Sequence, residues 1–475
     1  MKKEDLYKAV GDIPDGYINE SEAFQKKRRY RRSLWLLPLA AAVAILLLWP
    51  KHTAPGITDP VLSPMVLAEA EMPEPLTDIT DLERFQYSED FFTWWEDFSK
   101  RRNASLDVNS PIGSFYENAI PVLLGNSTEN RIVSPINIWM ALAMLEETTA
   151  GNTQKEILQA LGVQDTKQLR TIANAVWNAC YDDTPALQCL LANSMWLNGA
   201  RSFHTDTLKV LADTYKASSY AGDPSDPAFT KMFQDWLNKN TKELLKDAVS
   251  EEEFSSDMVL TLASSLYYKN SWAMRFNASL TDTQPFHTPE GTVDTEFLHN
   301  TDHYDLYAGN TWTAVCLPLA DGGNMYIYLP DEGHTPEEVL RDPAIYAPMR
   351  KTATPANAEN DLVVLSLPSF DISGSLDLCE ILQELGIRSV FTMEADFSPL
   401  CDEKGLCVSD AHHAARLIVD EEGVTGAAYT EIAIAEGAIE PGETVEFTVD
   451  RPFAFTVVHA DSSILFSGIV THPEK

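Results

Sequence analysis

Two cysteines and two histidines lie close together near the carboxyl end of the chain: Cys401, Cys407, His412 and His413. Thiolate and imidazole groups are ligands that Zn²⁺ prefers in proteins. The spacing matches none of the common zinc patterns, and two adjacent histidines on a strand point to opposite faces of a sheet. We therefore expect no metal site here, and no metal or other cofactor elsewhere in the chain.

Catalytic motifs are missing from the sequence as well. It contains no Gly-x-Ser-x-Gly elbow, no His-Glu-x-x-His helix, no phosphate-binding glycine loop and no Cys-x-x-Cys pair. Carboxylates are so numerous that close pairs arise by chance. The sequence therefore offers no set of nucleophile, base and orienting group to which catalysis can be assigned.

A different pattern occupies residues 419–437, where an acidic turn precedes small residues and a short apolar alternation. One face of this segment carries no charge when every second residue is taken: Val424, Gly426, Ala428, Thr430 and Ile432. Such a segment suits an exposed loop and also a strand with one buried face. On the pattern alone, a plain edge strand or a small-residue linker is the simpler interpretation.

The composition is that of a globular protein with a strong acidic excess. The 475 residues are 44% hydrophobic and 22% charged, which leaves room for one large domain or for two or three ordinary ones. The 35 basic residues against 71 acidic ones give a formal net charge of −36, so nucleic acid is not an expected partner. Residues 1–32 are the exception, with nine basic and six acidic residues.

Residues 34–49 form the only long apolar run, sixteen residues without a charge, directly after a polybasic segment. A helix of this length is about 24 Å long, and Trp35 and Trp49 would lie at the membrane interfaces. We therefore predict a signal-anchor over residues 33–50 that spans the cell membrane once. Residues 1–32 would form a cytoplasmic basic tail, with the remainder of the chain outside. The alternatives are a signal peptide cleaved near Ala54, giving a secreted protein, and a buried core helix.

Beyond this segment the sequence predicts a linker and one domain. Residues 51–107 are expected to form an extracytoplasmic stalk, because Pro, Thr, Glu and Asp are frequent at its start. Residues 108–475 show no second proline-rich break. Helical patterns come early, at 136–147 and 229–245. Strand patterns come later, at 259–268, 313–317, 325–329, 362–367, 445–449, 453–458 and 464–469. This order predicts an α+β domain with large antiparallel or mixed sheets.

Six cysteines are few for an exported chain of this size, so they do not indicate a disulfide framework. Pairing of Cys180 with Cys189, pairing of Cys401 with Cys407 and buried unpaired thiols are all compatible with the spacing.

Several short motifs resemble those of the serpins, in the same order along residues 108–473. The first, Val133-Ser134-Pro135-Ile136-Asn137-Ile138, is similar to the family's Phe-Ser-Pro-x-Ser-Ile segment. The others lie at 192–197, 236–241, 266–272, 328–330, 367–370, 385–386, 395–398, 450–453 and 465–468. Although no single motif is decisive, their order and spacing together are specific.

The resemblance implies a serpin-like α+β fold with a large central β-sheet, further sheets, a helical layer and an exposed reactive-centre loop at about residues 421–445. A target protease would cleave this loop as a substrate and form an acyl-enzyme. By the same resemblance the chain itself does no catalysis and is not expected to be an enzyme. The freed hinge would then enter the central sheet as an added strand before the ester is hydrolysed. The expected function is inhibition of serine endopeptidases, and of cysteine endopeptidases as a second class. A monomeric ectodomain of a membrane-anchored, prokaryote-like member would carry it.

The same resemblance assigns roles to individual residues. The hinge comprises Glu421, Glu422, Gly423, Val424, Thr425, Gly426, Ala427 and Ala428. The residues where the sheet opens are Ser134, Asn137, Ser264, Trp272 and His413. Counting by the family spacing from Gly423 places the scissile bond between Gly437 and Ala438. Because the loop is about four residues longer than usual, the bond is expected anywhere from Ala435 to Glu440.

Several positions depart from the family pattern. Asn137 stands where a serine is usual and Ser264 where an asparagine is usual, so the two changes compensate if these side chains meet. In the loop, Thr425 replaces a glutamate, Gly426 replaces an alanine, and Tyr429 is bulky where small residues are preferred. The alternative function is therefore a non-inhibitory serpin that acts as a surface binding or adhesion module.

Overall fold

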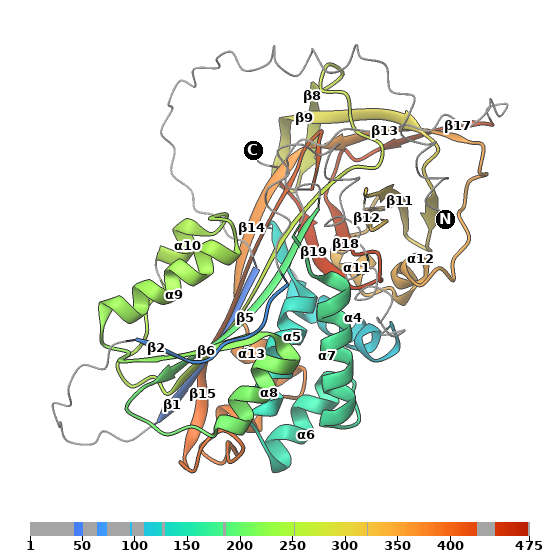
Figure 1. The fold of residues 1–475 in the computed structure, drawn as a ribbon. Helices are drawn as coiled ribbons and strands as arrows, with labels where there is room; N and C mark the ends of the chain where they lie inside the picture. Colours follow the sequence, from blue (N-terminus) through green and yellow to red (C-terminus); the bar gives the residue numbers. More distant parts are fainter. Residues whose placement is uncertain are drawn as a thin grey trace, which may run out of the picture. The chain divides into compact units, whose positions relative to one another are not determined.

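The protein is described by a computed structural model that covers residues 42–50, 64–73, 96, 109–125, 129–183, 187–250, 252–320, 322–424 and 442–473. Residues Met1–Pro38 and Leu39–Lys475 form two separate units, and the second unit contains the sheets and helices described below. Figure 1 shows the order of these elements along the chain.

The largest sheet has nine strands, and the order of its main path is β1-β15-β16-β7-β5-β6-β2, with β14 paired to β15 and β4 paired to β5. Its strands are β1 (Ala42–Pro50), β2 (Met65–Ala68), β4 (Asp182–Asp183), β5 (Gln188–Asn198), β6 (Ala217–Gly222), β7 (Leu260–Ser271), β14 (Phe370–Asp377), β15 (Leu406–Val419) and β16 (Gly423–Val424). Most pairs are antiparallel, and β5 with β6 is parallel. We call this the central sheet.

Two smaller sheets complete the β-structure. The six-stranded sheet has the order β10-β11-β12-β18-β19-β3, and the four-stranded sheet has the order β17-β13-β9-β8. The first comprises β10 (Leu306–Ala308), β11 (Trp312–Pro318), β12 (Asn324–Pro330), β18 (Phe453–Val458), β19 (Ile464–Val470) and β3 (Arg131–Val133). The second comprises β17 (Thr444–Thr448), β13 (Leu362–Pro368), β9 (Gly291–Asp302) and β8 (Asp282–Thr288). The predicted α+β class with a large central sheet is confirmed.

The helices in the described part of the chain lie mainly before β7 in sequence. They are α4 (Asn109–Leu124), α5 (Pro135–Glu147), α6 (Gly151–Ala160), α7 (Thr166–Cys180), α8 (Thr205–Tyr215), α9 (Pro227–Asn240), α10 (Lys246–Ser250), α11 (Pro336–Leu340), α12 (Tyr346–Met349) and α13 (Cys379–Glu384), with 3₁₀ turns η1 (Pro343–Ile345) and η2 (Ser389–Phe391). Local signals fix several starts: Pro135 occupies the first turn of α5, and the Asp165 side chain accepts a hydrogen bond from the Gln168 amide (2.7 Å) to cap α7.

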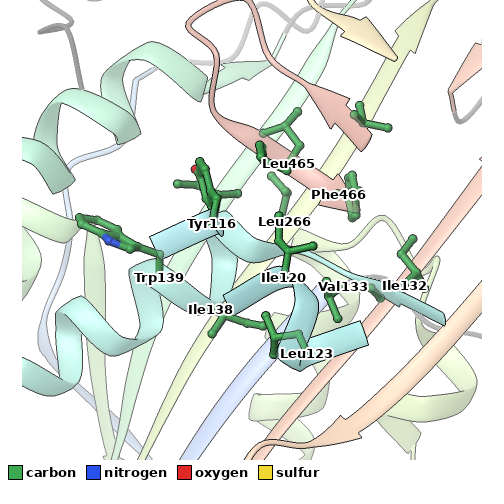
Figure 2. Packing of buried hydrophobic residues seen from close by; sticks show 14 of the residues in the cluster. Tyr116, Ile120, Leu123, Ile132, Val133, Ile138, Trp139, Leu266, Leu465 and Phe466 are labelled. Atoms are coloured by element: carbon green, nitrogen blue, oxygen red, sulfur yellow. The ribbon is translucent and has the colours of Figure 1, made fainter. Parts of the chain in front are cut away.

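Helix α5 is the buried helix around which the core is built. All thirteen of its residues are buried, and ten of them are apolar, as expected of a helix in the interior of a domain. Figure 2 shows Ile138 and Trp139 of this helix among side chains from α4, β3, β7 and β19. The helix therefore packs against both the central and the six-stranded sheet, close to the point where the hinge is expected to act.

Two short strands fall within the amino-terminal segments for which the sequence predicts an anchor and a stalk. Ala42–Pro50, part of the predicted signal-anchor, forms strand β1, and Met65–Ala68, part of the predicted stalk, pairs with β6 as strand β2. No helix in the described part of the chain is long and apolar enough to cross a bilayer. A continuous apolar run suits a strand inside a covered sheet as well as a membrane span, so the anchor over residues 33–50 stays a prediction.

Two adjacent glutamates are buried at the end of α5, in very different surroundings. Glu147 accepts two hydrogen bonds from Arg170 (2.7 and 2.6 Å) and one from the Tyr215 hydroxyl (2.8 Å). Glu146 accepts one from the Thr166 hydroxyl (2.5 Å), and its second oxygen has no hydrogen-bond partner among the described residues. Burial, with the neighbouring Glu147 charge adding to it, raises the pKa of Glu146 to about 7.

This raised pKa predicts a loss of stability with increasing pH. The folded protein holds the Glu146 proton more tightly than the unfolded chain does. The contribution of the Glu146 proton to the free energy of unfolding is therefore fully present below pH 4.5 and is lost as the pH rises to about 7. The difference amounts to roughly 3 kcal/mol. We expect Glu146→Gln to remove this loss, measured by urea unfolding of both proteins between pH 4 and pH 8.

The matched control for this experiment is Glu384→Gln, which changes an exposed glutamate at the end of α13. It should follow the wild-type curve. If Glu146→Gln loses the same stability as the wild type over this range, Glu146 is not the group that titrates.

Candidate functional site: the hinge and the gap between β7 and β15

The hinge enters the central sheet as the short strand β16. Gly423 pairs with Ser271 and Val424 with Asn270 of β7, and Val424 also pairs with Val419 of β15. The Val424 side chain is fully buried. The hinge therefore already has a strand partner on each side at Val424, its fourth residue.

Gly423 permits this pairing because the backbones approach very closely. A Cβ at this position would lie 2.1 Å from the Asn270 carbonyl oxygen and 2.7 Å from the Ser271 Cα. Both obstacles are backbone atoms, so no side-chain movement would relieve the clash. The sequence comparison assigned Gly423 to the hinge, and the structure supplies the steric reason for glycine.

Asp420 closes the turn that leads into β16. Its Oδ1 accepts hydrogen bonds from the amides of Glu422 (2.9 Å) and Gly423 (3.1 Å), and its own amide donates to the Gly423 carbonyl (3.2 Å). An aspartate side chain commonly stabilises a turn in this way. Sequence reasoning missed this residue, although an aspartate three positions before a glycine is a recognisable turn signal.

Trp272 holds the outer side of this turn. Its amide donates to the Glu422 carbonyl (3.1 Å), and its indole Nε1 donates to the Asp420 carbonyl (2.8 Å). The indole is 3% exposed and packs edge-on against Phe276, with 5.8 Å between the ring centroids. Glu421 is held by the Thr281 hydroxyl (2.8 Å). The structure thus places Trp272 against the hinge, where the resemblance located it.

The four other predicted residues meet beneath the central sheet. Ser134 precedes α5 and Asn137 lies in its first turn, whereas Ser264 and His413 are on β7 and β15. The Ser264 hydroxyl donates a short hydrogen bond to Asn137 Oδ1, and the Asn137 amide donates to the Ser264 carbonyl (3.1 Å). The two departures from the family pattern therefore meet, and each provides the partner that the other needs.

His413 is a buried neutral imidazole. Its Nε2 accepts a hydrogen bond from the Ser134 amide (2.9 Å), so the proton resides on Nδ1. Burial lowers the pKa of His413 to about 3, so it carries no charge near neutral pH. Neither Nδ1 nor the Ser134 hydroxyl has a hydrogen-bond partner within the described residues. The hydrogen bond from the Ser134 amide to His413 joins the start of α5 to β15. It is broken if these two elements separate.

Strand β1 occupies the same gap beyond the hinge. Ala42 pairs with Leu266 of β7, and Val43 pairs with Ser265 of β7 and with Ala414 of β15. Both β16 and β1 run antiparallel to β7 and to β15, so β1 continues in the direction set by the hinge. On β7, the residues that pair with β16 are separated from those that pair with β1 by Lys269, Tyr268 and Tyr267 only. The gap therefore accepts an additional strand along most of its length.

Other predicted residues lie elsewhere. Thr425, Gly426, Ala427 and Ala428 of the hinge, with Gly437, Ala438 and the whole range from Ala435 to Glu440, fall outside the described residues. His412 is exposed whereas His413 is buried, as predicted for neighbours on a strand. None of the six cysteines, all in the described part of the chain, forms a disulfide. The described residues that could together hold a metal ion are instead Cys180, His459 and Asp461, which are too far apart in sequence to form a motif.

The pair Asn137 and Ser264 predicts a reciprocal mutational effect. Asn137→Ser alone and Ser264→Asn alone each leave a buried polar group unsatisfied and should each cost about 1–3 kcal/mol. The double exchange restores the usual family arrangement and should recover at least about half of the summed loss. Urea unfolding of the three variants measures this coupling.

Ser265→Ala is the control, because Ser265 is the next residue of β7 and its buried hydroxyl has no hydrogen-bond partner in the described structure. Ser265→Ala should lower the free energy of unfolding only slightly. Strictly additive losses for the exchanged pair would show that the two side chains do not depend on one another.

Comparisons with known proteins agree with this geometry. A family model described as Serpin (serine protease inhibitor) matches residues 121–473. Serpin-ZX of Arabidopsis thaliana is 27% identical over 372 residues, which are 73% of this chain and 93% of that relative. The structure of Arabidopsis AtSerpin1 in its native stressed conformation has a TM-score of 0.65 at 26% identity, and covers 78% of this chain and 99% of its own.

Human thyroxine-binding globulin, solved in complex with thyroxine, shares the fold at 22% identity, with a TM-score of 0.65 over 80% of this chain and 100% of its own. Relatives of nearly equal identity come from Arabidopsis thaliana, Equus caballus and Thermococcus kodakarensis, so the comparisons do not single out the prokaryote-like character expected from the sequence. The family match extends from α4 to the end of β19 and includes the hinge, the gap and the residues beneath it. The chain therefore belongs to the serpin family.

Proposed function

We propose that this serpin is a suicide-substrate inhibitor of serine endopeptidases, with cysteine endopeptidases as a second target class. The observation that carries the proposal is strand β16. The hinge is already paired with both β7 and β15, and Val424 is buried between them. A chain cleaved beyond Val424 can extend this strand without changing its direction.

In the proposed mechanism the target protease supplies all of the chemistry. Its nucleophile attacks the scissile carbonyl between Ala435 and Glu440, the new amino terminus leaves, and the hinge side of the loop remains joined to the protease as an ester or thioester. The cleaved segment then extends β16 and forms backbone hydrogen bonds with β7 and β15. Each hydrogen bond contributes on the order of 1 kcal/mol, so a strand of this length supplies enough free energy to drag and distort the attached protease.

Strand β1 and an inserted loop compete for the same backbone groups. If the loop continued from Val424 in the register of β16, Ala428 would meet Leu266, which β1 pairs with Ala42. Full insertion therefore requires β1 to leave the gap. A membrane anchor over residues 33–50 would remove β1 from the sheet, so we retain the cell surface as the proposed location, with secretion as the alternative. The inhibitor itself is proposed to act as a monomer.

The inhibition proposal predicts a covalent complex. The full chain, mixed with elastase-like, subtilisin-like and glutamate-specific serine proteases, should give an SDS-stable complex with at least one of them. Val424→Arg would place a charge at the buried start of insertion. This variant should be cleaved as an ordinary substrate, with complex yield reduced more than about tenfold.

Val293→Arg is the control, because Val293 is 40% exposed on β9 and its change should leave complex yield unaltered. Mass spectrometry of the released fragment identifies the scissile bond. Clean cleavage by every protease without a complex, and without a rise in melting temperature after cleavage, would instead support the non-inhibitory binding function. Human thyroxine-binding globulin shows that the fold also occurs in a protein named for binding a small molecule.

The competition between β1 and the loop predicts a change in hydrogen exchange. In the intact chain held in solution without a membrane, the amides of Ala42–Pro50 should be protected, because β1 pairs on both sides. Proteolytic cleavage of the loop should displace β1 and increase exchange at these amides by at least about a hundredfold. The amides of β12, paired within another sheet, serve as the internal reference. Equal protection of Ala42–Pro50 before and after a cleavage that yields an inserted loop would contradict this competition.

A further inference from the structure

Three side chains with metal-ligating atoms gather where α7 meets the turn between β18 and β19. They are Cys180, the last residue of α7, together with His459 and Asp461 of the turn. One ligand atom from each lies within 4.8 Å of the other two. Cys180 is 1% exposed, His459 is 2% exposed, and the Asp461 side chain is 10% exposed. The cluster is separate from the hinge and from the residues beneath the central sheet.

The turn holds its two ligands in fixed positions. His459 Nδ1 and Asp461 Oδ1 are hydrogen-bonded to one another at 3.0 Å, and a bound ion would replace this contact. The Asp461 carboxylate also accepts hydrogen bonds from the Ser463 amide (2.9 Å) and hydroxyl (3.0 Å). The His459 amide donates to the Ser463 carbonyl (2.9 Å), which closes the turn at its base. Hydrogen bonds of this kind orient ligands in known metal sites.

The Tyr116 hydroxyl of α4 is buried beside the same turn, next to Ser463 and Ile464. A cavity of about 30 Å³, room for one water molecule, is lined by Tyr116, Met349 and Ser463 but by none of the three ligand side chains. It is therefore the three ligand atoms themselves that point to an ion.

Charge and ligand type select the ion. When a metal binds, the Cys180 thiol becomes a thiolate beside the Asp461 carboxylate, and a divalent cation balances both charges. Sulfur, imidazole nitrogen and carboxylate oxygen are the ligand types of Zn²⁺, whose usual coordination is tetrahedral. Binding would release the Cys180 thiol proton to solvent as the sulfur–metal bond forms.

We propose that Cys180, His459 and Asp461 supply three ligands of a structural Zn²⁺ site. The ion joins the end of α7 to the β18–β19 turn. It thereby ties the helical layer to the six-stranded sheet at a point remote from the gap.

Cobalt substitution of the full chain tests this site. The reduced protein, stripped with a chelator and titrated with Co²⁺, should bind about one equivalent and show a thiolate-to-cobalt charge-transfer band. Zn²⁺ should abolish the band and raise the melting temperature. Cys180→Ser should remove the band, and Asp461→Asn should weaken Co²⁺ binding by more than about tenfold.

Cys189→Ser is the matched control, because Cys189 is also fully buried, on the neighbouring strand β5, and lies outside the cluster. It should keep the band. Two results overturn the proposal: the wild-type protein gives no charge-transfer band, or the band persists in Cys180→Ser. Asp461→Asn keeps the size of the side chain and therefore provides a second folded variant if Cys180→Ser is unstable.

Discussion

The backbone groups of β7 and β15 require a strand between them. The two strands flank one gap, and each of them pairs with β16 and β1 rather than with the other. Buried amides and carbonyls without partners are costly, so whichever segment fills the gap gains free energy. The hinge, the anchor-like apolar run and the cleaved loop are all candidates for this one position. The proposed function depends on which of them occupies it.

The residues beneath the gap explain how it can open. Asn137 and Ser264 satisfy one another, whereas His413 contacts α5 through one hydrogen bond and keeps an unpartnered Nδ1 in the described structure. A neutral imidazole can leave this contact without exposing a charge. The contact beneath the sheet is therefore directional but weak, which suits a sheet that must admit another strand.

The sequence predicted the strands with regular β-branched patterns well. Residues 453–458 and 464–469 agree with β18 and β19 almost residue for residue. It missed β5 and β15, because Gln188–Asn198 has few β-branched residues and Leu406–Val419 contains charges and two histidines. The motif comparison named Trp272, which lies against the hinge in the structure, and His413, which lies beneath the central sheet. Asp420 has a local turn signal that was overlooked, whereas the cluster of Cys180, His459 and Asp461 depends on tertiary contacts that no local pattern encodes.

The spacing between β16 and β1 also limits how many loop residues can enter the gap while β1 is in place. Only Lys269, Tyr268 and Tyr267 of β7 separate the two paired stretches, so about three loop residues fit beyond Val424 before β1 must move. Loop entry should then occur in two stages: a short reversible step that the intact chain can make, followed by a committed step that ejects β1. Strand β1 would thus keep the rest of the loop out of the gap, and its removal would make insertion irreversible.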